Sequence, residues 1–234
     1  MLLQDKVAVV YGASGAIGGA VARAFAAAGA TVHAPAHGEV DTLDEPAVER
    51  HLDALGRVDL SFNAIGLPNV EMLGVPLLEI ELERFARPIA EYTTSFFVTA
   101  RAAARRMDSG VIMTVSALPG HFGTPLNGGY GPAQAAKEAM IRDLSHELAP
   151  RGIRVVGLIP HGLPETQTMR DIYELKAQQA MTWEQFQAAL VSTAHPKRGS
   201  TLAEVGAAAV LAASDLAGGL TGTTLNLTLG AVPG

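Results

Sequence analysis

A glycine-rich turn near the start of the sequence joins an apolar run to a helical pattern. The run KVAVVYG (6–12) is rich in β-branched residues, and IGGAVARAFAAAGA (17–30) has the pattern of a helix. Small residues in such a turn let the backbone approach a diphosphate, whose charge is attracted by the free N–H groups and the dipole of the helix N-terminus. A P-loop would need a Gly-Lys-Ser/Thr ending, which is absent, and a purely structural turn is the remaining alternative. We expect the ligand to contact Gly12, Ser14, Gly15, Ala16, Ile17 and Gly18.

The rest of the chain alternates between apolar runs and helical patterns. Further strands are predicted at 31–36, 58–64, 110–117, 153–160 and 223–230, and helices at 44–55, 82–107, 130–149 and 201–214. Strands that are apolar on both faces and alternate with helices form parallel sheets covered on both sides. We therefore predict an α/β fold with a Rossmann-type doubly wound parallel sheet, built as a single NAD(P)-binding domain over residues 1–234.

One junction conflicts with this pattern. The segment HGEVD (37–41) resembles another strand, but only about two residues separate it from the preceding strand, whereas a parallel crossover needs a dozen or more. Either the third strand has been lost or a helix-containing stretch near residues 36–38 is missing, and the exposed apolar flanks that a deletion would leave favour the second explanation.

Composition narrows the classes of function. The net charge is −6, with no run of lysine or arginine, which argues against nucleic acid or an anionic membrane as partner. Arg101, Arg105 and Arg106 form the densest basic cluster, which we interpret as a solvated helix face. The chain has no cysteine, no predicted signal peptide and no apolar stretch of membrane-spanning length, and its seven histidines are scattered, so we expect a cytoplasmic protein without a metal site.

Several motifs in the same order resemble those of the short-chain dehydrogenase/reductase family. The turn from Gly12 to Gly18 resembles its Gly-x-x-x-Gly-x-Gly motif, with Ala16 in place of the middle glycine, and FNAIG (62–66) resembles its Asn-Asn-Ala-Gly strand end. The C-terminal segment 195–227 is similar to the family's last helix and strand. The resemblance implies that NAD or NADP is bound, with further contacts from Asp41 to the adenine, from Asn63, Ala64 and Pro160, and from Thr166 to the carboxamide or phosphate.

In this family a tyrosine exchanges a proton with the substrate oxygen while hydride moves to or from the nicotinamide. By resemblance Tyr130 matches that tyrosine, although a tyrosine here could also simply cap a buried helix end. In the family a lysine four residues later shares its helix face, so that both side chains reach one cleft. The partners of the tyrosine differ here: Gln134 occupies the lysine position, Ala117 the serine position and Tyr92 the asparagine position. Glutamine supplies no charge, so the tyrosine should stay protonated and any activity should favour carbonyl reduction.

Other groups near Tyr130 are candidates to replace its missing partners. Ser116 precedes Ala117 and would serve only if the strand has opened into a loop there, while Lys137 lies ~10.5 Å along the helix from the tyrosine and is a poor substitute. His121, Thr124 and Asn127 follow in the next loop, where they could orient a substrate oxygen, although we expect them to be exposed to solvent. The catalytic set predicted from the sequence is Tyr130, Gln134 and Ser116.

The segment 163–195 leaves the sheet. Its apolar residues favour a lid over a small non-polar carbonyl or alcohol, although they would also suit simple packing on the domain.

The competing function is a catalytically degenerate NAD(P)-binding protein that acts as a sensor or oligomer partner. The resemblance implies a homodimer or homotetramer built on 82–107 and 130–149, unless the apolar stripe of AMIRDLSHEL (139–148) packs only on its own sheet. The choice between NAD and NADP depends on the side chain after the second strand, and neither His37 nor Glu39 decides it.

Overall fold

The structure, a computed structural model, describes residues 1–233, and its strands form one parallel sheet of six in the order β2-β1-β3-β4-β5-β6. The strands are β1 (Val7–Tyr11), β2 (Thr31–His33), β3 (Leu60–Asn63), β4 (Gly110–Val115), β5 (Ile153–Pro160) and β6 (Thr223–Leu227). Each lies inside an apolar run identified in the sequence, so the prediction of a Rossmann-type parallel sheet is confirmed. The chain turns from one half of the sheet to the other between β1 and β3, whose pairing runs from Ala8 with Leu60 to Tyr11 with Asn63.

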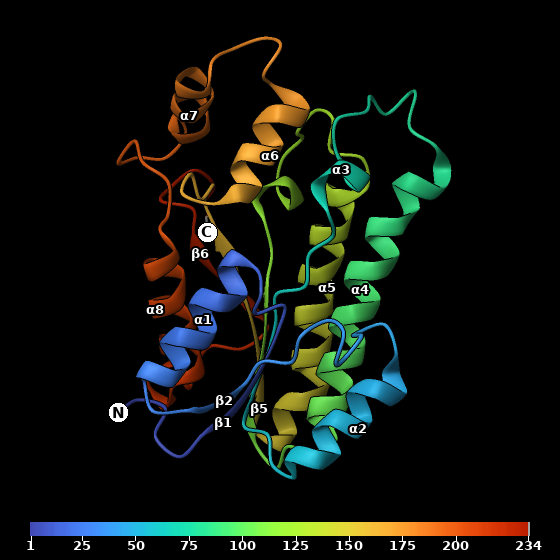
Figure 1. Cartoon of the computed structure of the whole chain (residues 1–234). Coiled ribbons are helices and arrows are strands. Elements are labelled where there is room, and N and C mark those ends of the chain that lie inside the picture. The colour runs from blue at the N-terminus through green and yellow to red at the C-terminus, as the bar shows by residue number, and fades with distance from the viewer. Residues whose placement is uncertain (234) are drawn as a thin grey trace.

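Helices cover both faces of the sheet (Figure 1). On one face α1 (Ala16–Ala27) packs against α8 (Leu202–Ala213), and on the other α4 (Leu82–Ala104) packs against α2 (Glu45–Leu55) and α5 (Tyr130–Leu148). Three shorter helices, α3 (Asn69–Met72), α6 (Gln167–Lys176) and α7 (Trp183–Val191), lie beyond the carboxyl ends of the strands. The short 3₁₀ turns η1 (Leu118–Gly120), η2 (Ala149–Arg151) and η3 (Asp215–Ala217) complete the elements of residues 1–233.

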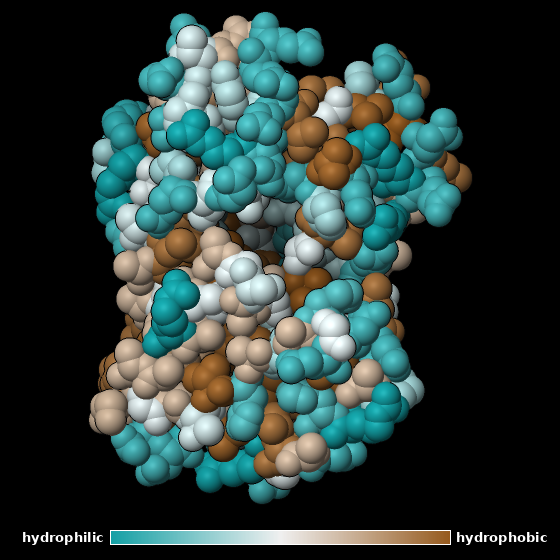
Figure 2. All heavy atoms as spheres, viewed as in Figure 1, coloured by the Kyte–Doolittle hydropathy of each residue, from teal (hydrophilic) through white to brown (hydrophobic). Residues whose placement is uncertain are grey.

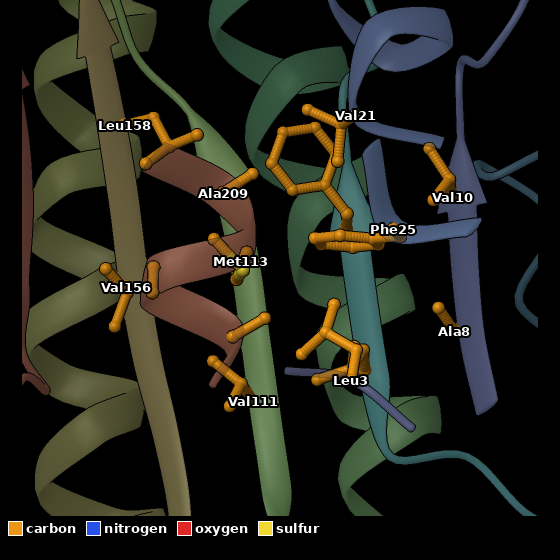
Figure 3. Close-up of a cluster of buried hydrophobic side chains, with 14 of the residues drawn as sticks. Leu3, Ala8, Val10, Val21, Phe25, Val111, Met113, Val156, Leu158 and Ala209 are labelled. Atoms are coloured by element: carbon orange, nitrogen blue, oxygen red, sulfur yellow. The ribbon is translucent and has the colours of Figure 1, made fainter. Parts of the chain in front are cut away.

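The strands inside the sheet bury their two sets of side chains in different cores. Ala8 and Val10 face α1 and α8, where Phe25 meets Phe62 edge to face with ring centroids 6.4 Å apart (Figure 3). Val9 points the other way, into the layer beneath α2, α4 and α5. This two-sided burial explains why the strands read as continuous apolar runs rather than as alternating ones.

The segment HGEVD is not a strand. The backbone N–H groups of Glu39 and Val40 both donate to the carbonyl of Ala36, at 2.9 and 3.1 Å, and the Ala36 N–H donates to the Glu39 carboxylate. Val40 is buried in the core beneath α2, so β2 stays at the edge of the sheet and a compact turn leads to α2. Whether a strand has been lost or a stretch near residues 36–38 is missing stays open, because this turn fits either explanation.

Two other surface features differ from or refine the sequence interpretation. Arg106 is not a solvated residue, because its guanidinium binds Asp53 and Glu49 of α2, and Arg101 and Arg105 pair with acidic residues of the same helix.

The apolar stripe of 139–148 packs on its own sheet: Ile141 is fully buried there. The homo-oligomer therefore stays a prediction. No helix within residues 1–233 is both long and apolar enough to cross a membrane.

Candidate active site

The glycine turn lies where the sheet changes direction, between β1 and the end of β3. Gly12 has a φ of +78°, and a Cβ on it would lie 2.6 Å from the carbonyl oxygen of Ala64. A Cβ on Gly18 would collide with the carbonyl of Gly12, which holds the start of α1 against the turn. Only glycine fits these two positions: at Gly12 both the positive φ and the lack of space exclude a side chain, and at Gly18 the lack of space does.

No side chain caps the free backbone N–H groups at the N-terminus of α1. Gly15 is the N-cap and provides no side-chain hydrogen bond, and the first turn contains no acidic residue. The first N–H groups of a helix lack intrahelical partners and carry its positive dipole. This end of α1 can therefore bind an anionic group such as a diphosphate. The uncapped helix end and the glycine turn before it fit a bound dinucleotide.

A largely apolar cavity of about 640 Å³ begins at this helix end and extends beneath α6 and α7. In Figure 2 it appears as a hollow near the middle of the visible face. Of the residues predicted from the sequence, nine line it: Ala16, Ile17, Gly18, Ala64, Ser116, Tyr130, Gln134, Pro160 and Thr166. Gly12, Ser14, Gly15, Asp41 and Asn63 do not line it, the first three because they form the turn beside it.

Tyr130 is the first residue of α5 and lies in the cavity wall. Its ring meets that of Tyr92 of α4 edge to face, with centroids 5.8 Å apart. Burial raises the pKa of the Tyr130 phenol well above its ordinary value, and the neighbouring Tyr92 acts in the same direction. Tyr130 is thus held in its protonated form and suits the role of a proton donor.

Gln134 follows one helical turn later and is 2% exposed. Its side-chain oxygen is buried without a hydrogen-bond partner among residues 1–233. An unsatisfied buried amide costs free energy, about 1–3 kcal/mol, which a ligand bound in the cavity would recover. The residue that replaces the expected lysine is therefore available for a hydroxyl of the ligand.

Ser116 lies directly after the last residue of β4. Its backbone N–H still donates to Leu158 of β5, at 2.8 Å, while its side chain lines the cavity and donates to the Glu138 carboxylate at 2.5 Å. The strand has ended at Val115, as the role predicted for this serine requires. Its partnership with Glu138 could not be read from local pattern, because the two residues are 22 positions apart in the chain.

Lys137 is a component that the sequence interpretation rejected. It is 1% exposed, lines the same cavity as Tyr130, and its ammonium donates to the carbonyl of Val115 at 2.5 Å. Burial lowers the pKa of Lys137 to about 7, although the Glu138 carboxylate opposes the shift. Residues seven apart share a helix face, and the long lysine side chain spans the remaining distance to the cavity.

The loop residues expected in solvent are partly buried. Asn127 is 8% exposed and accepts a hydrogen bond from Lys176 of α6 at 2.5 Å, and Thr124 lines the cavity with a buried hydroxyl. His121 is exposed as expected. The loop is therefore covered by α6, which the sequence alone did not place.

Three residues assigned to cofactor contacts have side-chain bonds within the protein. The Asn63 amide donates to Ser95 and Thr99 of α4, both at 3.0 Å. Asp41 is exposed and accepts from the Leu43 backbone at 2.9 Å, and the Thr166 hydroxyl donates to the Leu163 carbonyl at 2.8 Å. Only Thr166 of these three reaches the cavity.

His161 was missed by the sequence interpretation. It follows the last residue of β5, is 2% exposed and lines the cavity, yet both of its ring nitrogens are buried without a hydrogen-bond partner. Burial lowers the pKa of His161, which favours the neutral imidazole. Its position directly after a predicted strand end was the signal available. Within residues 1–233 there is no group of three His, Asp or Glu side chains able to hold a metal ion.

The glycine turn at the strand switch, the bare helix end and the buried tyrosine define the class of NAD(P)-dependent oxidoreductases with a Rossmann fold. A family model described as Enoyl-(Acyl carrier protein) reductase matches residues 38–231. The chain belongs to the short-chain dehydrogenase/reductase family, as the sequence motifs predicted.

Individual relatives support this assignment. The chain is 30% identical over 190 residues to enoyl-[acyl-carrier-protein] reductase [NADH] 1 of Rhizobium meliloti, an alignment that covers 79% of this chain and 66% of that enzyme. It is 28% identical to 3-oxoacyl-[acyl-carrier-protein] reductase FabG of Escherichia coli, over 97% of both chains. Its fold matches the crystal structure of sorbitol-6-phosphate 2-dehydrogenase SrlD from Erwinia amylovora with a TM-score of 0.86 and 23% identity, over 97% of this chain and 100% of that one.

Proposed function

We propose that the protein reduces the carbonyl group of a small non-polar substrate with NADH or NADPH, and that Tyr130 donates the proton. The observation that carries this proposal is the position of Tyr130 in the wall of an apolar cavity that begins at the bare N-terminus of α1. The reaction consumes the reduced cofactor, one proton and the ketone, and yields the oxidised cofactor and the alcohol. The bound cofactor supplies the hydride.

The residues of this chain have separate roles in the proposed complex. The N–H groups at the start of α1 bind the diphosphate, and the unpartnered amide of Gln134 binds a ribose hydroxyl. Asp41 and Thr166 keep the contacts that the family resemblance implies, to the adenine and to the carboxamide or phosphate. Phe186 and Leu190 of α7 cover the apolar end of the cavity and exclude water from the carbonyl.

Tyr130 acts on the oxygen of the substrate. Because burial raises its pKa, the phenol is protonated at neutral pH and cannot serve as the base that alcohol oxidation requires. The negative charge that develops on the carbonyl oxygen during hydride transfer is relieved by the phenolic proton. Reduction is therefore the direction that this site supports.

The test combines cofactor binding with turnover. The purified protein is mixed with NADH or NADPH and a panel of hydrophobic ketones and quinones, to which the names of the relatives add 3-oxoacyl and enoyl thioesters. Tyr130→Phe should lower turnover roughly 10²- to 10⁴-fold, with little change in cofactor affinity. Tyr173→Phe is the matched control, because the Tyr173 hydroxyl bonds only Met181 of the chain at 3.0 Å and lies outside the cavity lining.

The competing function, a cofactor-binding protein without catalysis, has one observation in its favour: Gln134 stands where the family has its lysine. Cofactor binding without turnover on any substrate of the panel would support that alternative. Turnover that Tyr130→Phe leaves unchanged would reject the role of the tyrosine.

A further inference from the structure

Lys176 places an ammonium group in the wall of the largely apolar cavity. It is the last residue of α6, is half-buried, and lines the cavity together with Asn127 of the loop before α5. The ammonium donates to the side-chain oxygen of Asn127 at 2.5 Å. Burial lowers the pKa of Lys176 to about 8, and no neighbouring charge takes part in that shift. The group is therefore still mostly protonated at neutral pH, in surroundings that stabilise its charge poorly.

Within residues 1–233 no carboxylate pairs with this ammonium. Of the described residues that line the cavity, only Asp171 is acidic, and its carboxylate accepts from Gln167 of the same helix at 2.9 Å. None of the ion pairs in this part of the chain includes Lys176. A half-buried cation without a carboxylate partner costs free energy, because a protein interior stabilises charge less well than water does. An anionic group of a ligand would recover that cost.

The cavity differs in charge from the chain as a whole. The sequence has a net charge of −6, whereas the cavity lining holds two lysines, Lys137 and Lys176, against Asp171. The Lys137 ammonium donates to the Val115 carbonyl and lies over the Tyr92 ring, where α4 and α5 form the wall. Lys176 instead extends from α6, the helix that covers the cavity.

Lys176 lies far along α6 from the residue expected to contact the cofactor. Thr166, for which the family resemblance implies a contact to the carboxamide or phosphate, is the N-cap of α6, and Lys176 is its last residue. At ~1.5 Å per residue the two are ~15 Å apart along the helix axis. The ammonium is therefore available to the substrate rather than to the cofactor.

Asn127 connects this ammonium to the start of α5. Its side-chain oxygen accepts from Lys176, and its backbone carbonyl accepts from the Tyr130 N–H at 3.0 Å. Tyr130 is the first residue of α5 and lines the same cavity. Because one residue bonds both of them, a substrate whose carbonyl lies at Tyr130 can reach Lys176 with a second group.

We propose that the substrate is an oxo acid, and that Lys176 binds its carboxylate while Tyr130 acts on its carbonyl. The proposal rests on the proposed reductase function, and it narrows the substrate class to apolar carbonyl compounds that also carry a carboxylate. An ammonium has three N–H donors, of which Asn127 takes one, so two remain for the carboxylate. Lys176 determines specificity, since it contacts the substrate away from the reacting carbon and takes no part in hydride or proton transfer.

A carboxylate suits this position better than a phosphate. The single charge of the ammonium matches the single charge of a carboxylate, whereas a phosphate carries more charge and is commonly bound by the paired N–H groups of arginine. Among the described residues that line the cavity there is no arginine. The largely apolar walls around Lys176 suit the hydrocarbon part of an oxo acid.

The alternative is that Lys176 only fastens α6 to the loop before α5. Two substitutions separate the roles. Lys176→Gln keeps an N–H donor for Asn127 but removes the charge, and Lys176→Arg keeps the charge. A fastening role affects acidic and neutral ligands alike, whereas a carboxylate site affects only the acids.

The experiment compares oxo acids with their methyl esters, for example benzoylpropionate and methyl benzoylpropionate, within a panel of aromatic and straight-chain pairs. Each pair shares the ketone and the apolar part and differs in charge. With NAD⁺ or NADP⁺ bound to the full chain no hydride is available, so calorimetry measures ketone binding without turnover. The wild type should bind at least one acid roughly tenfold or more tightly than its ester.

The variants assign that preference to one side chain. Lys176→Gln should lose it, and Lys176→Arg should retain most of it. In turnover with the reduced cofactor, Lys176→Gln should raise KM for the acid by a similar factor and leave kcat, and the KM of the ester, little changed. Lys197→Gln is the matched control, because Lys197 is an exposed lysine outside the cavity whose ammonium bonds the Ser192 carbonyl at 2.7 Å.

The outcomes separate this proposal from the proposed function. A wild type that binds no acid of the panel more tightly than its ester rejects the carboxylate site, and the reductase function stands if the same protein reduces neutral ketones. Tighter binding of phenacyl phosphate than of the acids, or equal losses for acid and ester in Lys176→Gln, also rejects the site. Acid binding that depends on Lys176 without turnover of any ketone supports the carboxylate site and rejects the reductase function.

Discussion

The ammonium of Lys137 lies 5.5 Å from the centre of the Tyr92 ring, against the cavity that Tyr130 also lines. A cation over the face of an aromatic ring is attracted by the ring quadrupole. Burial in this apolar surrounding nevertheless lowers the pKa of Lys137 to about 7. The lysine of this site is therefore a cation that gives up its proton easily, in contrast to a solvated lysine.

The first prediction concerns the pH dependence of stability. In the unfolded chain the pKa of a lysine is ~10.4, so between pH 7 and that value the folded state binds fewer protons at Lys137 than the unfolded state. The free energy of unfolding should therefore increase with pH across this range, by about 2 kcal/mol from pH 7 to pH 9 from this group. Lys137→Met should lack that increase in urea unfolding, while the contribution of the half-buried Lys176, whose pKa is lowered to about 8, is shared by both proteins and cancels. Parallel pH profiles for wild type and variant would contradict the assignment.

The second prediction separates a structural from a cofactor role for Asn63. Its amide holds the end of β3 to α4 through Ser95 and Thr99. Asn63→Ala leaves both hydroxyls without this buried partner and should lower the free energy of unfolding by about 1–3 kcal/mol. NADPH affinity measured by calorimetry at a temperature where both proteins are folded should change little. Ser95→Ala, which removes one of the two bonds, should have a smaller effect on stability, and a large loss of affinity in Asn63→Ala would restore the cofactor role predicted from the sequence.

The strands, the glycine turn and Tyr130 could be predicted because their signals are local. A β-branched run, a glycine spacing and a helical pattern are readable within a dozen residues. The hydrogen-bond partners of Ser116 and Lys137 could not be predicted from the sequence, because they depend on how the η1 turn packs against α5. The identity of residue 134 showed that the expected lysine was absent, but only the packing shows that Lys137 reaches the same cavity.

At the junction after β2, the local sequence pattern predicts a strand that the fold does not form. The residues of HGEVD have the composition of a short edge strand, yet Ala36 and Glu39 close a turn there. Strand formation requires a neighbouring strand to pair with, and the chain between β2 and α2 is too short to provide the crossover. Because no crossover is available, these strand-like residues form a turn instead of a strand.

The third prediction concerns the ion pairs between α2 and α4. The Arg106 side chain is 15% exposed and bonds both the Asp53 carboxylate, at 2.6 Å, and the Ala102 carbonyl, at 2.9 Å, whereas the Arg105 side chain is 54% exposed. Arg106→Ala should lower the free energy of unfolding by about 1–2 kcal/mol, and Arg105→Ala by roughly 0.5 kcal/mol or less. Urea unfolding at low and high salt checks both values. Equal losses for the two variants would mean that burial of the arginine does not determine the strength of these pairs.

The fourth prediction concerns the attachment of the α6–α7 segment. Trp183, the single tryptophan of the sequence, stacks on Phe186 with centroids 5.7 Å apart, and Phe186 lines the cavity. Bound NADPH should therefore quench the Trp183 emission by energy transfer, which gives a direct signal for binding and release. The bond from Lys176 to Asn127 joins α6 to the loop before α5 at 2.5 Å.

A hydrogen bond to a charged group contributes about 1.5 kcal/mol or more, so Asn127→Ala should speed NADPH release by roughly tenfold if α6 has to move for the cofactor to leave. Stopped-flow tryptophan emission measures that rate, with Glu174→Ala on the exposed side of α6 as the matched control. The control should release NADPH at the wild-type rate. An unchanged release rate in Asn127→Ala would mean that the contact between Lys176 and Asn127 has no part in retaining NADPH. The α6–α7 segment would then pack on the domain without acting as a lid.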